Sequence, residues 1–161
     1  MLPKIAFYPC CLHDFSEPMQ ILKELVDIIY FCDIHKYKEF DEFISMQSYL
    51  NPNVIFMHGD ARKVIKDINQ IDVLFYRRDS SGEGGSGLFV LGDSFLPFIL
   101  ERYNPNGGKI ITDGSNSRGG IYKKMKRRSG FKKYGWHILL SNEQRFLKDH
   151  NLYTFDVLPQ T

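Results

Sequence analysis

The chain has 161 residues, of which 43% are hydrophobic and 25% charged, and its formal net charge is +2, as is ordinary for a globular protein. One domain over residues 1–161 is expected, because this length buries a core without requiring a second one. The apolar runs are no longer than a strand, which excludes a transmembrane helix, and the N-terminus lacks the apolar core of a secretory signal. Three cysteines make no disulfide framework. We therefore expect a cytoplasmic protein without membrane contact.

Apolar strand-like runs alternate with helical patterns along the chain. Strands are predicted at residues 3–10, 27–33, 53–60, 71–78 and 109–114, and helices at 14–27, 37–50, 61–69 and 88–103. Asp14 or Ser16 can cap the first helix and Pro18 suits its first turn, while Pro97 predicts a kink in the fourth helix. Two further strands are predicted at 135–141 and 152–159, without a long apolar helix between them.

The order of these elements predicts the fold class. Five strands that alternate with helices require right-handed crossovers, and therefore a parallel sheet with helices on both faces. The last two strands are joined by a short polar segment, so we expect them to form an antiparallel hairpin at one edge. The prediction is an α/β protein with a doubly wound, mostly parallel seven-stranded sheet and an antiparallel C-terminal edge hairpin.

Positive charge is concentrated in residues 118–133, which hold eight basic residues and no acidic one. Removing these eight from the 21 basic residues leaves 13 against 19 acidic ones, a net charge of −6 for the rest of the chain. Such a basic block predicts a localised anionic partner, and its candidate contacts are Lys123, Lys124, Arg127 and Arg128. The alternative is a solvated loop and helix face that binds no ligand.

Several short motifs share one pattern, in which an acid closes the second strand, Gly-Asp-Ala follows the third, and a glycine-rich turn precedes the fifth. They are FCDI (31–34), HGDARKVI (58–65), IDVLFY (71–76) and ILERYNPNGGKIITDG (99–114). With the order of elements, they resemble the class I S-adenosylmethionine-dependent methyltransferases, a Rossmann-like fold family. The resemblance implies S-adenosylmethionine as cofactor, with Asp33 on the ribose and Asp60 at the adenine edge. It places Asp14, Tyr8 and Cys10 beside the methionine end.

Two stretches depart from the family pattern. The first turn, residues 9–14, carries cysteines, leucine and histidine where the family has glycines, and their Cβ atoms narrow the approach of a cofactor. After the fourth strand, Arg77, Arg78 and the glycine-rich stretch 79–87 replace the Asp/Asn-Pro-Pro-aromatic motif of the family's amino-methylating members. The catalytic candidates on the acceptor side are therefore Asp79, Arg77 and Arg78.

Other candidate groups have structural alternatives. The thiols of Cys10, Cys11 and Cys32 lie near His13 in the predicted sheet, but adjacent cysteines point different ways and suit a metal site poorly. We therefore expect buried thiols that pack as small apolar groups, and no metal site. Asp60 has the alternative role of capping the helix that follows it.

The leading hypothesis is a small methyltransferase-like protein that binds S-adenosylmethionine or a related nucleotide and methylates an anionic or nucleotide-like acceptor. The alternative is a catalytically inactive scaffold that acts as an immunity- or antitoxin-type inhibitor of a partner enzyme, because an inhibitor does not need an open first turn. A nucleic-acid-binding accessory domain is a third hypothesis, supported by the basic block.

Overall fold

The computed structural model describes residues 2–46, 53–78, 90–92, 94–115, 131–140 and 151–160. The strands in these ranges are β1 (Ile5–Tyr8), β2 (Ile28–Asp33), β3 (Asn53–His58), β4 (Val73–Tyr76), β5 (Gly108–Thr112), β6 (Trp136–Leu140) and β7 (Tyr153–Pro159). The helices are α1 (Ser16–Leu22), α2 (Lys38–Ser45), α3 (Ala61–Val64) and α4 (Leu96–Arg102), with the short 3-10 helices η1 (Ile65–Asp67) and η2 (Lys132–Tyr134). Within the same ranges, no helix has both the length and the apolar character needed to cross a membrane.

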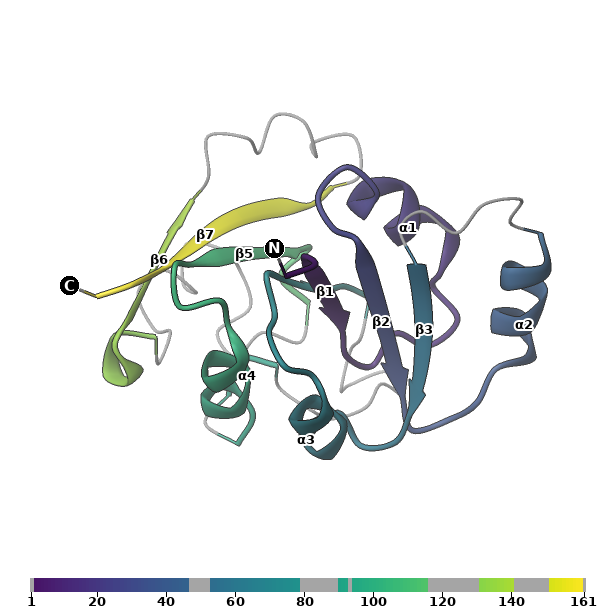
Figure 1. The fold of residues 1–161 in the computed structure, drawn as a ribbon, viewed down its shortest axis with the longest axis horizontal. Helices are drawn as coiled ribbons and strands as arrows, with labels where there is room; N and C mark the ends of the chain where they lie inside the picture. Colours follow the sequence, from purple (N-terminus) through teal and green to yellow (C-terminus); the bar gives the residue numbers. More distant parts are fainter. Residues whose placement is uncertain are drawn as a thin grey trace.

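The strands form one sheet in the order β3-β2-β1-β4-β5-β7-β6 (Figure 1). The first five strands are mutually parallel, and β7 runs antiparallel to both of its neighbours, β5 and β6. This arrangement confirms the predicted α/β class and the mostly parallel sheet with an antiparallel C-terminal hairpin. The chain moves outward from β1 in one direction as far as β3 and then returns to β4 on the other side, so the switch point lies between β1 and β4.

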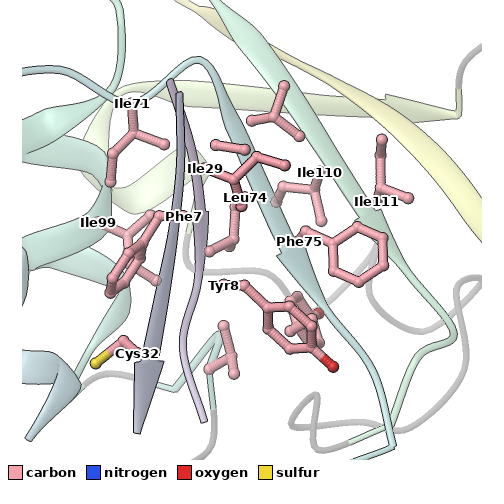
Figure 2. Close-up of a cluster of buried hydrophobic side chains, with 14 of the residues drawn as sticks. Phe7, Tyr8, Ile29, Cys32, Ile71, Leu74, Phe75, Ile99, Ile110 and Ile111 are labelled. Carbon is pink, nitrogen blue, oxygen red and sulfur yellow. The ribbon is translucent and has the colours of Figure 1, made fainter. Parts of the chain in front are cut away.

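The central strands are buried on both faces, as their nearly continuous apolar sequences require. Every residue of β1 and β4 is buried. Helices α1 and α2 lie on one side of the sheet and α3 and α4 on the other (Figure 1). Phe15, just before α1, packs edge-on against Phe31 of β2 and stacks on Phe43 of α2. Figure 2 shows part of the core, with Phe7, Leu74 and other apolar side chains drawn from neighbouring strands.

Several helix boundaries differ from the predictions, and α1 ends at Leu22 and α3 at Val64, both earlier than expected. Helix α1 begins after Phe15 without a side-chain cap, because the carboxylate of Asp14 is bonded elsewhere. The fourth helix begins only at Leu96, and Pro97 lies in its first turn, so the proline does not kink a longer helix. A proline in the first turn lacks only an N–H that would have no helical partner there.

β4 and β5 lie close together at their N-terminal ends, beside the buried Asp72. One carboxylate oxygen of Asp72 accepts the Ile5 N–H at 2.9 Å, and the other accepts the side-chain amide of Asn104 at 3.0 Å. The carbonyl oxygen of Asp72 accepts the Lys109 N–H at 2.8 Å. A Cβ atom on Gly108 would lie only 2.3 Å from that carbonyl oxygen, so the close approach of β4 and β5 requires glycine at this position.

We expect Gly108→Ala to lower the free energy of unfolding by about 2–3 kcal/mol, because the added methyl group forces the two strands apart. Urea denaturation measures this loss. Gly135→Asn is the matched control, since a Cβ at Gly135 meets nothing within 4 Å and asparagine tolerates its left-handed backbone. Equal losses in the two variants would contradict the requirement for close approach.

Candidate functional site

The carboxyl ends of the parallel strands meet at one edge of the sheet, where ligands bind in folds of this kind. A hollow of about 260 Å³ lies there at the switch point. Its walls come from the end of β1, the first turn and the end of β4, and they are formed by Tyr8, Cys11, Leu12, His13, Asp14, Arg77 and Arg78. This volume is slightly below the range of about 300–1,000 Å³ that is usual for small-molecule sites.

The first turn contains no glycine, yet two of its residues adopt the positive φ angles that glycine favours. Cys10 has φ 56° and Leu12 has φ 54°, both in the left-handed region. For residues with a Cβ atom this conformation costs about 1–2 kcal/mol each. Hydrogen bonds hold it in place, because the Cys11 N–H donates to the Cys32 carbonyl at 3.0 Å and the Leu12 N–H donates to Oδ2 of Asp33 at 2.9 Å.

Asp33, the expected ribose contact, lies beneath this turn and is only 5% exposed. Its Oδ2 accepts the Leu12 N–H, and its Oδ1 accepts the His35 N–H at 2.9 Å and, more distantly, the Tyr37 hydroxyl at 3.5 Å. In this arrangement Asp33 is therefore closed to the ribose of S-adenosylmethionine, because its carboxylate is covered and both oxygens already accept protein donors.

Arg77 is the centre of a buried ionic cluster at the end of β4. Its Nε and Nη2 donate to the two oxygens of Asp14 at 2.7 and 2.8 Å, and its Nη1 donates to Glu17. The hydroxyl of Tyr8 donates to the same Asp14 carboxylate at 2.7 Å. Burial opposes the charge of Arg77, but the bonds to Asp14 and Glu17 outweigh it and raise the pKa of the guanidinium above its usual value.

Arg78, by contrast, faces the solvent. Its side chain is 62% exposed and its guanidinium lies 4.0 Å from Asp14 and 3.9 Å from Glu17. Its backbone has φ 58°, and its N–H donates to Asp113, which follows β5, at 3.1 Å. Of the two arginines expected on the acceptor side, only Arg78 is therefore open to a ligand.

Asp60 caps α3, which confirms the alternative role that the sequence allowed. Its Oδ1 accepts the Arg62 N–H at 2.9 Å, and the Arg62 guanidinium pairs with the same carboxylate at 2.8 Å. The hydrogen bond from Arg62 lowers the pKa of Asp60. The carboxylate stays 30% exposed, so one side of it remains available to a ligand.

The cysteines of this region are not joined by disulfides. Cys11 and Cys32 are buried, and burial raises the pKa of both thiols, which makes them poor nucleophiles. They pack as small apolar side chains, as expected, while Cys10 is half-buried. Across the described ranges, no three His, Cys, Asp or Glu side chains are grouped as metal ligands are.

The described part of this edge is acidic. Near the switch point it holds the carboxylates of Asp14, Glu17, Asp33 and Asp113 and the guanidinium groups of Arg77 and Arg78. These charges sum to −2 for this edge as a whole, whereas the hollow itself is lined by Asp14, Arg77 and Arg78.

Sequence reasoning missed two of these residues. Asp113 could have been found from the sequence, since it directly follows the buried strand β5, much as Asp33 ends β2. Glu17 could not, because an acid in the first turn of a helix is ordinary and its partner lies 60 residues away.

Some predicted residues lie outside the described ranges. They are Asp79 with the stretch 79–87, and the basic contacts Lys123, Lys124, Arg127 and Arg128.

Replacing Arg77 by methionine leaves the Asp14 carboxylate without its main partner. We expect Arg77→Met to lower the free energy of unfolding by about 3 kcal/mol in urea denaturation. Arg78→Met is the control and loses less than about 1 kcal/mol, because its ion pairs are long and exposed. A loss at Arg77 no larger than at Arg78 would contradict a structural role for the cluster.

The comparisons with known proteins concern the fold. The whole sequence matches no family model and no curated protein. A spermidine synthase in complex with the transition-state analogue AdoDATO is 14% identical with a TM-score of 0.59, and the alignment covers 99% of this chain and 55% of that one. An rRNA methylase from Streptococcus thermophilus is 11% identical with a TM-score of 0.54, covering 98% of this chain and 87% of that one.

A 16S rRNA methyltransferase is 10% identical with a TM-score of 0.58, and the alignment covers 98% of this chain and 88% of that one. The chain spans about half the length of the spermidine synthases that it matches. Similarity at this level of identity establishes architecture. The protein has the Rossmann-like fold of the class I S-adenosylmethionine-dependent methyltransferases.

Proposed function

We propose that this protein binds S-adenosylmethionine, or a closely related nucleoside, at the switch point between β1 and β4. The observation that carries the proposal is the hollow at this point, which is lined by the left-handed residues Leu12 and Arg78 and lies beside a third, Cys10, in the same turn. Strained backbone of this kind gathers at ligand sites because a stable fold would otherwise avoid it. Solved structures of methyltransferases share the fold and support the choice of ligand.

In this proposal each end of the ligand has its own residues. The exposed side of Asp60 meets the adenine edge, and Asp33 meets the ribose once the first turn has moved. Asp14, with Tyr8 and Cys10, borders the methionine end. The cofactor supplies an activated methyl group when bound. Transfer to an anionic or nucleotide-like acceptor belongs to the same proposal and draws support from the rRNA methyltransferases among the structural neighbours.

The excess of carboxylates along this edge should favour S-adenosylmethionine over S-adenosylhomocysteine. The methyl donor carries a net positive charge, because its sulfonium and ammonium groups outnumber its carboxylate, whereas the product is neutral overall. We expect a dissociation constant about fivefold lower for the donor at low salt, and a smaller ratio at high salt. Calorimetric titrations at two ionic strengths measure the ratio. A preference for the neutral product would contradict the electrostatic basis of the proposal.

Substitution of Asp60 tests the adenine contact without removing the helix cap. Asparagine caps a helix as well as aspartate does, so Asp60→Asn should fold normally yet bind S-adenosylmethionine about fivefold more weakly. Asp67→Asn, at an exposed acid of η1, is the matched control and should bind like the native protein. No heat from the native protein at millimolar ligand would overturn cofactor binding altogether.

A different observation supports a second candidate function. The covered carboxylate of Asp33 and the paired Arg77 suit a scaffold that has given up cofactor binding. Such a protein would act by contact with a partner, for example as an immunity- or antitoxin-type inhibitor. Absence of S-adenosylmethionine binding together with a stable fold would favour this alternative.

A further inference from the structure

The peptide group between Cys11 and Leu12 determines both the backbone strain at Leu12 and the access of a ligand to Asp33. The peptide between Cys11 and Leu12 carries the N–H that donates to Oδ2 of Asp33 at 2.9 Å. The same peptide sets φ of Leu12, which is 54°. A flip of this peptide would turn the N–H away from Asp33 and move φ of Leu12 to a negative value. Release of the carboxylate and relief of the strain are therefore one motion.

The surroundings allow that motion to stay local. The Cys11 N–H belongs to the preceding peptide and can keep its bond to the Cys32 carbonyl. Asp14 is held by Arg77 at the other end of the turn. Leu12 is 36% exposed and His13 is exposed, so the flip uncovers little apolar surface. It breaks one further bond, from the Asp14 N–H to the Cys11 carbonyl at 3.1 Å.

We propose that the Cys11–Leu12 peptide is a latch that closes over Asp33 and flips to release this carboxylate to the hydroxyl groups of a bound nucleoside. The proposal deepens the function proposed above and rests on it for the identity of the ligand. In the closed state the charged hydrogen bond to Asp33 opposes the left-handed strain at Leu12. Because these terms are of similar size, both states are within reach of a ligand.

Two substitutions at Leu12 move the latch in opposite directions. Glycine adopts positive φ freely and stabilises the closed state, whereas valine is β-branched and strongly disfavours it. Amide hydrogen exchange in the ligand-free protein reports the ratio of closed to open states at residue 12. After correction for intrinsic rates, we expect exchange to slow about threefold in Leu12→Gly and to quicken by at least that factor in Leu12→Val.

Internal and external controls separate the latch from general loosening. The Cys11 amide should exchange at its native rate in both variants, because its bond to Cys32 lies outside the flip. Asn151→Gly replaces another left-handed residue, with φ 57°, and should leave residue 12 unchanged. The latch would be overturned if the exchange rates of residues 11 and 12 changed in parallel. It would also be overturned if the exchange rate of residue 12 changed in the same direction in both Leu12 variants.

Titration with S-adenosylmethionine then separates the two proposals. A latch predicts about threefold weaker binding to Leu12→Gly and tighter binding to Leu12→Val. If Leu12→Gly binds more tightly than the native protein, the side chain merely narrows a static cleft, so the latch fails and the proposed function stands. If the native protein does not bind while exchange follows the expected order, the latch stands and the proposed ligand falls.

Discussion

The buried guanidinium of Arg77 constrains everything around the switch point. A charge removed from water must be neutralised by hydrogen-bonded acids, and Asp14 and Glu17 provide them from the first turn and from α1. This requirement joins the end of β4 to the segment that follows β1. It also explains why α1 begins without a side-chain cap, since the Asp14 carboxylate is shared between Arg77 and the buried hydroxyl of Tyr8.

Anchoring of Asp14 by Arg77 fixes one end of the first turn. Its backbone adopts at Cys10 and Leu12 the left-handed form that glycine adopts without strain, and it is held there by hydrogen bonds instead of by residue type. The bond from Leu12 to Asp33 involves a charged acceptor and offsets much of the strain. In the binding mode that we propose, a nucleoside hydroxyl would replace the Leu12 N–H as the donor to this carboxylate.

The fold alone does not decide between a methyl-transferring enzyme and a binding scaffold. Class I methyltransferases and spermidine synthases share this architecture with the chain at 10–14% identity, and one architecture supports many activities. In this protein four carboxylates and two guanidinium groups lie near the switch point, whereas residues 118–133 of the sequence are basic.

The sequence by itself determined the alternation of strands and helices, the mostly parallel sheet, the acid that ends β2 and the acid that comes shortly after β3. Hydrophobic period and capping chemistry act over a few residues, so the helix cap at Asp60 was visible from its neighbours alone. Only the tertiary structure decided that Arg77 would be buried against Asp14, 63 residues away, and that Asp33 would lie beneath Leu12. Such contacts depend on how the turn folds back over the sheet, and no local pattern carries that geometry.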